Sequence, residues 1–199
     1  MKLAALLCTL LSCGTIANAD PCQDRFAELL VSGFEDKGPT LIHITQEIVG
    51  GQTSVTWHHS DGNGNGMSEV IEPDGSPWSL FLNGKMYTSA DKGKNWTFMS
   101  AFDGAAARAK NKAAMIKDAA TVRDLSCTQA DLNGAVHEVV EGTYTSSVIA
   151  GAEIFEKTWV NPKTGAITQS YRHVMMDSYQ TKTTQVIEPH PELNLPNPE

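Results

Sequence analysis

The sequence predicts an α+β protein with a curved, mainly antiparallel sheet of about ten strands packed against two or three helices. Three observations indicate this fold class. Apolar and polar residues alternate with a period of two in many short segments, which is the pattern of strands with one buried face. Short turns rich in Gly, Asn and Asp separate most of these segments, as they do between antiparallel neighbours. Two segments with helical spacing interrupt the series, and helices beside an antiparallel sheet define the α+β class.

The N-terminal residues 1–19 have the order of a secretory signal peptide. Lys2 precedes an apolar run over Leu3–Leu11, and Ala17-Asn18-Ala19 forms a small-x-small cleavage site. The apolar run is shorter than the roughly 20 residues that a membrane-spanning helix needs. We therefore expect a periplasmic or secreted protein, and we favour the periplasm of a Gram-negative bacterium.

An alternative interpretation of the same region is a lipid anchor. The string Leu10-Leu11-Ser12-Cys13-Gly14 resembles a bacterial lipobox, in which Cys13 would be lipidated and become the new N-terminus. The small-x-small site is the better formed of the two, so we favour the unanchored product. A lipidated Cys13 would place the protein at a membrane surface.

The remaining chain predicts a single domain over residues 20–188 and an extended, exposed, Pro-rich tail over residues 189–199. Loss of Lys2 leaves 14 basic and 23 acidic residues, a formal charge of −9. This charge repels phosphate backbones, so we do not expect nucleic acid as a partner. No later apolar run approaches membrane length, and nothing in the pattern indicates an oligomeric state.

Two cysteines remain in the mature chain, Cys22 and Cys127. A single pair in an oxidising compartment favours a disulfide between them. The alternative is two separate thiols.

The first helix is predicted from Asp20, which can cap it, and from Pro21 at the first helical position, with Gly33 near its end. A second helix should cover residues 104–120 after Asp103, and we expect its basic residues to be exposed and three apolar ones to be buried: Ala109, Ala113 and Ile116. The predicted strands begin at Leu41 and continue at residues 55–57, 67–72, 78–82, 85–89, 96–99, 136–144, 153–160, 166–176 and 178–188.

A calcium-loop pattern lies over residues 61–72. Asp61, Asn63, Asn65, Gly66 and Glu72 occupy each specified position of D-x-[DN]-x-[DN]-G-x5-E. Alternating oxygen ligands could surround calcium, a hard cation. Strands rather than helices flank this loop, and the competing interpretation is an ordinary Gly- and Asn-rich hairpin turn. No cofactor other than this calcium is expected.

Other local motifs are interpreted as structural. Ser89-x-Asp91-x-Gly93-x-x-Trp96 matches the Asp-box of sialidase-like propellers, where it forms a hairpin turn away from the chemistry. His58 and His59 are adjacent and on a strand would point to opposite faces, so they cannot share a metal. None of the common nucleophile, zinc or phosphate-loop motifs occurs, and no catalytic residue is assigned.

Aromatic residues on the predicted strands could line a pocket for an apolar ligand. The alternative is that these residues pack in an ordinary hydrophobic core and bind no ligand. The candidate lining consists of Trp57, Trp78, Phe81, Phe155 and Trp159.

Two hairpin sequences carry a resemblance to a known family. Phe81-Leu-Asn-Gly-Lys-Met-Tyr87 followed by Asp91-Lys-Gly-Lys-Asn-Trp96 resembles the central hairpin of the LolA-like superfamily, and Trp159-Val-Asn-Pro-Lys-Thr-Gly-Ala-Ile167 is similar to its W-V-D-P-x-T-G-x-I hairpin. In that superfamily a curved antiparallel sheet wraps around helices and leaves an apolar cavity. Its members carry lipids or lipoproteins or sense the state of the cell envelope. The resemblance implies a half-barrel fold, but none of the family's functional residues can be placed on this chain.

Three functions are consistent with these observations. The first is non-catalytic binding or carriage of a lipid, a lipoprotein acyl chain or another apolar ligand in the periplasm. The second is a secreted interaction module with calcium bound at residues 61–72. The third is an enzyme whose site is assembled from distant residues.

Overall fold

The computed structural model describes residues 20–33 and 38–198. The predicted signal peptide and the alternative lipid anchor at Cys13 lie outside the described residues.

The described chain contains two α-helices, each with an aspartate cap. Helix α1 covers Pro21–Ser32, and the Asp20 side chain accepts a hydrogen bond from the Cys22 backbone N–H at its start. Helix α2 covers Gly104–Ala119, and Asp103 accepts one from the Ala106 N–H. Each cap satisfies a donor that the first helical turn leaves free, so both helices begin where the sequence predicts.

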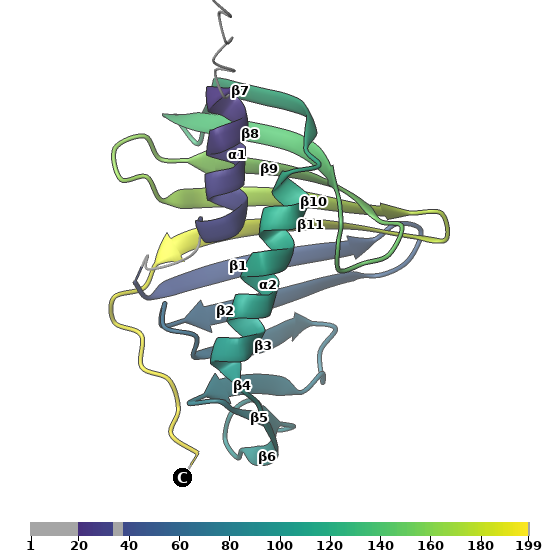
Figure 1. Cartoon of the computed structure of the whole chain (residues 1–199). Coiled ribbons are helices and arrows are strands. Elements are labelled where there is room, and N and C mark those ends of the chain that lie inside the picture. Colours follow the sequence, from purple (N-terminus) through teal and green to yellow (C-terminus); the bar gives the residue numbers. More distant parts are fainter. Residues whose placement is uncertain (1–19, 34–37, 199) are drawn as a thin grey trace, which may run out of the picture.

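Eleven strands form one antiparallel sheet in the order β6-β5-β4-β3-β2-β1-β11-β10-β9-β8-β7 (Figure 1). Their bounds are β1 Thr40–Ile48, β2 Thr53–Ser60, β3 Gly66–Glu72, β4 Trp78–Leu82, β5 Lys85–Ser89, β6 Thr97–Ala101, β7 Arg123–Leu132, β8 Ala135–Thr145, β9 Glu153–Val160, β10 Ile167–Met176 and β11 Tyr179–Pro189. The edge strands β6 and β7 do not pair with each other, so the sheet stays open as a half-barrel. The predicted fold class is confirmed.

The hairpin between β4 and β5 illustrates why local sequence predicts so many of these turns. Asn83 and Gly84 have φ angles of 52° and 73°, in the left-handed region. Two consecutive positive φ angles define the tight turn that matches strand twist, and Asn-Gly adopts them at low cost.

Strand β7 is an element that the pattern did not predict. It is a sheet edge, and most of its ten residues are exposed. An edge strand with exposed polar residues lacks the apolar alternation of its neighbours, so periodicity alone does not reveal it.

The two helices lie on the same face of the sheet, and α2 crosses the strands steeply (Figure 1). Helix α1 packs on β7, β8 and α2, and the main contacts of α2 are with α1 and β8. The core gathers beneath α1 and consists of Phe26, Leu29, Val140, Tyr144, Ile154, Val160 and Ile167.

The prediction for the buried side of α2 is wrong. Ala109 and Ala113 are exposed, and Ile116 keeps 56% of its surface exposed. Asp118 and Ala119 are the buried residues of this helix. The buried part of the helix is its C-terminal end, and most residues before Ala114 are exposed, so the helix buries no apolar stripe along its length.

The segment after β11 is extended but only partly exposed. His190 packs edge-on against His59 of β2, with 5.6 Å between the ring centroids, and its N–H donates to the Pro39 carbonyl. Leu193 and Leu195 are half-buried. Among the described residues, neither helix has the length and apolar character needed to cross a membrane.

Candidate ligand-binding groove

The register of the sheet shows which residues face the helices. Residues opposite each other on antiparallel strands project to the same face. Val140 packs with Phe26 of α1, and its row across the sheet is Val140, Thr158, Ser170, Gln185, Ile44 and Thr56. Positions that alternate with this row along each strand face the opposite side.

Four of the five candidate lining aromatics lie on the face away from the helices. Trp57, Phe155 and Trp159 alternate with helix-facing neighbours on their strands. Trp78 is next to Ser79, which pairs with the helix-facing Ser68. Phe81 alone faces the helices, with its ring 5.8 Å from that of Phe102. None of the five lines either cavity described below.

Two cavities lie next to each other on the helix-covered face. The larger has a volume of about 460 Å³ and is lined by Ile44, Gln46, Ile149, Glu156, Ser170, Arg172, Val174, Met176, Tyr179, Thr181, Thr183 and Gln185. The second, of about 260 Å³, is lined by Gly33, Gly38, Thr40, Ile42, Ser60, Gly62, Asn161, Thr164, Ala166, Ile167, Thr168, Ile187 and Pro189. We refer to the two cavities together as the groove.

The strands β1 and β11 connect the two cavities. Ile44 and Gln185 line the larger cavity, and the next helix-facing residues on the same strands, Ile42 and Ile187, line the smaller one. Successive residues on one face are about 7 Å apart. The smaller cavity has no charged lining residue, whereas the larger one contains an ion pair, so the two ends of the groove differ in charge.

The ion pair joins Glu156 on β9 to Arg172 on β10. Arg172 Nε donates to Glu156 Oε2 at 2.6 Å across directly opposed positions. Burial raises the pKa of the Glu156 carboxyl, and the Arg172 guanidinium opposes that shift. The Glu156 side chain is 9% exposed and that of Arg172 is 42% exposed. The cavity therefore meets the guanidinium more than the carboxylate.

Polar neighbours hold this end of the groove in place. Burial raises the pKa of the Tyr144 hydroxyl, and the positive charge of Arg172 lowers it. Asp118 at the end of α2 accepts a hydrogen bond from the Ser147 N–H at 2.7 Å. The loop that follows Ser147 carries Val148 and Ile149, which are 69% and 39% exposed. Ile149 lines the larger cavity, so its rim is apolar.

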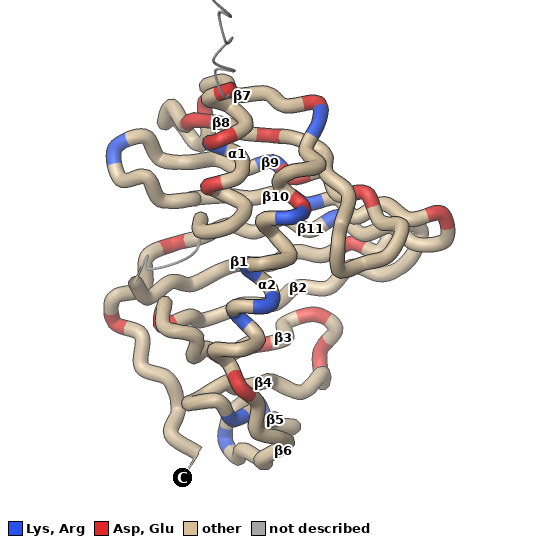
Figure 2. The backbone as a smooth tube through the Cα atoms, in the orientation of Figure 1, with Lys and Arg blue, Asp and Glu red and all other residues tan. Residues whose placement is uncertain are grey.

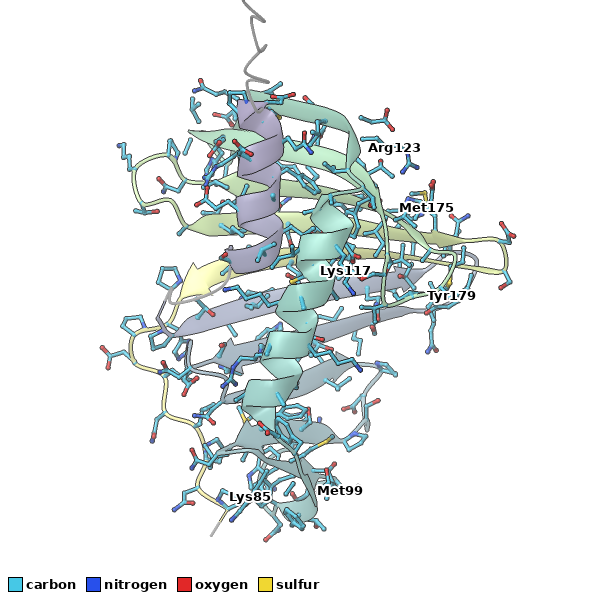
Figure 3. The ribbon with its side chains drawn as sticks, in the orientation of Figure 1. Lys85, Met99, Lys117, Arg123, Met175 and Tyr179 are labelled. Carbon is cyan, nitrogen blue, oxygen red and sulfur yellow. A yellow bond between two sulfur atoms is a disulfide. The ribbon has the colours of Figure 1, made fainter. Side chains whose placement is uncertain are left out.

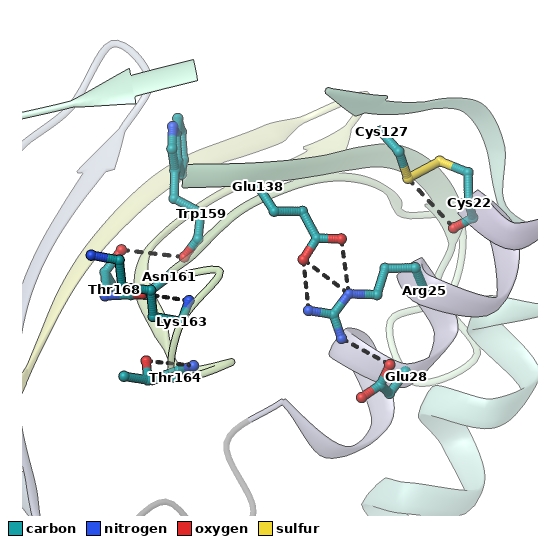
Figure 4. Close-up of polar contacts among 11 residues, drawn as sticks. Cys22, Arg25, Glu28, Cys127, Glu138, Trp159, Asn161, Lys163, Thr164 and Thr168 are labelled. Atoms are coloured by element: carbon teal, nitrogen blue, oxygen red, sulfur yellow. Dashed lines mark hydrogen bonds and ion pairs between the residues drawn. A yellow bond between two sulfur atoms is a disulfide. The ribbon is translucent and has the colours of Figure 1, made fainter. Parts of the chain in front are cut away.

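A second ion pair and the disulfide fasten α1 to the sheet (Figure 4). Arg25 donates to both oxygens of Glu138 on β8 and also bonds Glu28. Cys22 and Cys127 are bonded, with their Cα atoms 5.7 Å apart. The predicted disulfide is thus present between α1 and β7. The disulfide fastens the helix whose C-terminal cap, Gly33, lines the smaller cavity, and its own cysteines line neither cavity.

Asp61, Asn63 and Asn65 of the calcium-loop pattern lie together, but Glu72 does not lie with them. Asp61 accepts hydrogen bonds from the N–H groups of Asn63 and Asn65 and from the Asn65 side-chain amide. Glu72 lies at the far end of β3, six residues beyond Gly66, which is roughly 20 Å along an extended strand. Within the described residues, no group of three or more His, Cys, Asp or Glu side chains could hold a metal ion.

The Asp-box residues form a hydrogen-bonded turn. Asp91 accepts hydrogen bonds from the Asn95 side chain and backbone and from the Ser89 hydroxyl, which lower the pKa of its carboxyl to about 2. Gly93 has a φ of 82° and lies against the Trp78 ring. These contacts are structural.

The adjacent histidines point to opposite faces, as their spacing predicts. The ring of His58 lies 2.9 Å from the Ser68 hydroxyl, and burial lowers its pKa. His59 Nε2 lies 2.9 Å from Glu69 Oε1 but lacks the geometry of a hydrogen bond.

Sequence reasoning missed the groove residues, above all Glu156 and Arg172. One available signal was that Arg172 is the only Asp, Glu, Lys or Arg residue of β10. In β9 no such signal existed, because Glu153 and Lys157 are charged as well, and the two aromatic residues of the strand lie on its outward side.

Comparisons with known proteins give likenesses at the level of structure only. No protein-family profile and no curated protein matches the chain. The solved structures that it resembles include a chain of the Pseudomonas aeruginosa MucA/MucB complex, with 14% identity and a TM-score of 0.41 over 85% of this chain and 58% of that one. The chain therefore spans less than two thirds of that relative.

Two further likenesses cover nearly whole chains. One is a LolA superfamily protein from Nitrosomonas europaea, with 8% identity and a TM-score of 0.37 over 86% of this chain and 94% of that one. The other is a domain named as an outer membrane lipoprotein-sorting protein from Vibrio parahaemolyticus, with 10% identity and a TM-score of 0.32 over 84% and 89%. At such TM-scores these likenesses carry no weight for function, and the fold assignment rests on the open sheet and its helices.

Proposed function

We propose that this protein binds and carries an acyl-chain amphiphile in the periplasm without chemical conversion. The observation that supports the proposal is the groove of about 460 and 260 Å³ on the helix-covered face of the sheet. Its volume falls in the range of small-molecule sites, and its apolar end is lined by Ile42, Ala166, Ile167 and Ile187. An apolar chain in that end would leave water, which favours binding.

The disulfide is consistent with this location, because such bonds persist in oxidising compartments. Export through residues 1–19 remains our expectation from the sequence.

The proposal is tested by native mass spectrometry of the protein purified from the periplasm, followed by organic extraction. We expect a co-purifying acyl species. Thr183→Trp places a large side chain in the larger cavity and should abolish its recovery. Thr184→Trp, one residue away on the opposite face, is the matched control and should retain it. Wild-type protein that yields no acyl species and binds none after addition would refute the proposal.

One observation favours a second candidate, an enzyme with a dispersed site. Glu156 is a carboxyl of raised pKa in a cavity, which is the environment of many general acids. Against this, the Glu156 side chain is 9% exposed and bonded to Arg172, so a ligand meets the guanidinium first. Hydrolysis of p-nitrophenyl acyl esters that Glu156→Gln abolishes would support the enzyme and displace the carrier.

A further inference from the structure

We propose that the amphiphile in the groove carries an anionic headgroup, a carboxylate or a phosphate, and that Arg172 binds it. This inference rests on the proposed function, since it adds a headgroup site to the acyl-binding groove. Three features of the molecule support it: the exposed guanidinium, the difference in polarity between the two cavities and the positive charge of α2.

The geometry of the ion pair presents positive charge to the cavity. Glu156 occupies Arg172 Nε, which supplies one of the five N–H donors of the guanidinium. The Arg172 side chain is 42% exposed and lines the larger cavity, whereas that of Glu156 is 9% exposed. Arginine binds planar anions such as carboxylates and phosphates through two parallel hydrogen bonds. The donors that Glu156 does not take are thus suited to an anionic headgroup.

The arrangement of the groove fits a molecule with one polar and one apolar end. The smaller cavity is lined by uncharged residues, including Ile42 and Ile187. The larger cavity adds Arg172 together with the hydroxyl and amide groups of Ser170, Thr183 and Gln185. A chain in the smaller cavity would direct its headgroup toward β10, where these hydrogen-bonding groups gather.

Helix α2 adds positive potential over the same face of the sheet (Figure 2). It carries Arg108, Lys110, Lys112 and Lys117 against a single acidic residue, Asp118, for a helix charge of +3. The whole chain has a charge of −8, so this concentration of basic residues runs against the overall balance. A local positive field raises the concentration and the on-rate of anionic ligands.

The test compares ligands that differ only in the headgroup. Dodecanoate, dodecyl phosphate and 1-dodecanol are titrated by calorimetry, at pH 7.5 and below their aggregation limits, into delipidated wild-type protein. We expect at least one of the two anions to bind about tenfold or more tightly than the alcohol, the range of a hydrogen bond to a charged group. The tighter of the two anions identifies the headgroup as a fatty-acid carboxylate or a phospholipid phosphate.

Three variants test whether Arg172 is the source of the preference for anions. Arg172→Gln should lower the affinity for the anion to that for the alcohol and leave the affinity for the alcohol unchanged. Because that variant leaves Glu156 buried without its partner, the double variant Glu156→Gln/Arg172→Gln provides a neutral pair that should fold and show the same loss. Glu156→Gln alone should keep the anion preference or increase it.

The outcomes separate the headgroup site from the carrier function. Equal affinity of the wild type for the anions and the alcohol would overturn the headgroup inference and leave acyl binding standing. An anion preference that survives in the double variant would overturn the role of Arg172. Failure to bind all three ligands would overturn the proposed function together with this inference.

Discussion

At the scale of single residues, the pairing of Glu156 with Arg172 decides the character of the groove. A carboxylate at this depth is costly unless a cation and a hydrogen bond compensate it, and Arg172 supplies both. Burial raises the pKa of Glu156, and Arg172 restrains that rise. The same guanidinium is the most exposed charge of the larger cavity. Arg172 thereby neutralises the carboxylate with one donor and exposes its remaining side-chain surface to the cavity.

The first prediction concerns the pH dependence of stability in Arg172→Gln. Without the guanidinium the folded-state pKa of Glu156 rises further. The folded protein then loses stability as the pH rises from the unfolded pKa through this raised pKa, because the buried carboxyl must ionise. Below the unfolded pKa of about 4.3 the carboxyl is protonated in both states, and the charge-dependent loss vanishes. We expect a loss of about 1–3 kcal/mol at pH 8, below the usual range for buried pairs because Arg172 is partly exposed.

Urea denaturation at pH 4 and pH 8 measures this difference. The Glu156→Gln/Arg172→Gln variant is the control and should lack the pH-dependent component. A loss of equal size at both pH values would show that Arg172 stabilises the fold through packing rather than through the charge of Glu156.

At the scale of elements, helix α2 is embedded only near its C-terminal end, where Asp118 and Ala119 are buried. Asp103 caps its start, and the main contacts of the helix are with α1 and β8. Figure 3 shows the end of α2 near Lys117 beside α1. Met115 is half-buried and lines a void of about 50 Å³ with Phe26 and Leu29. The adjacent Ile116 is 56% exposed. Most helical residues before Met115 lie in solvent, where the high helix propensity of alanine supports them.

The second prediction follows from this asymmetry of α2. Met115→Ala removes part of a packed side chain and should cost about 1–2 kcal/mol, less than a fully buried site would. Ile116→Ala removes an exposed side chain and should change stability by at most about 0.5 kcal/mol. Chemical denaturation of the two variants checks the difference. Equal costs would mean that the exposed side of α2 is covered in solution.

The turns show how much of the elements local sequence can predict. Asn83 and Gly84 adopt positive φ angles that few other residue pairs tolerate, so the β4–β5 hairpin was predictable from those two residues. Caps at Asp20 and Asp103 were predictable for the same local reason. The edge strand β7 was not, because its pairing with β8 leaves most of its residues in solvent.

At the scale of the whole molecule, the open sheet and the disulfide determine how the groove is held. The sheet does not close, so helices rather than strands cover its inner face. The Cys22–Cys127 bond joins α1 to the β7 edge across a separation of 105 residues. Arg25 and Glu138 add a second link between α1 and the sheet. The position of α1, whose C-terminal cap Gly33 lines the smaller cavity, therefore depends on a covalent constraint.

The third prediction is that Cys22→Ser/Cys127→Ser lowers the free energy of unfolding by about 4–5 kcal/mol, since a loop of this length loses much closure entropy on crosslinking. The melting temperature should fall by roughly 10–20 °C for a chain of this size. Calorimetry of the variant, and of wild-type protein with and without reductant, provides the measurement. An unchanged melting temperature in both experiments would contradict the stabilising role of the bond.

The composition, the turns and the alternating segments were enough to predict an α+β sheet of about this size, the hairpins and the Cys22–Cys127 pair. The sheet, the turns and the hairpins depend on residues close in sequence. The disulfide depends on the presence of only two cysteines after residue 19, which allow a single pairing. The face of each strand was beyond that reach. An extra residue, Thr168, shifts the register between β9 and β10, and a shift of one residue reverses which side chains face the helices. Glu156, Arg172 and the isoleucines of the groove therefore lie on the side of the sheet that the helices cover. Trp57, Phe155 and Trp159 lie on the other side. The sequence alone could not distinguish the two sides, because long-range contacts determine which side of an alternating strand is covered.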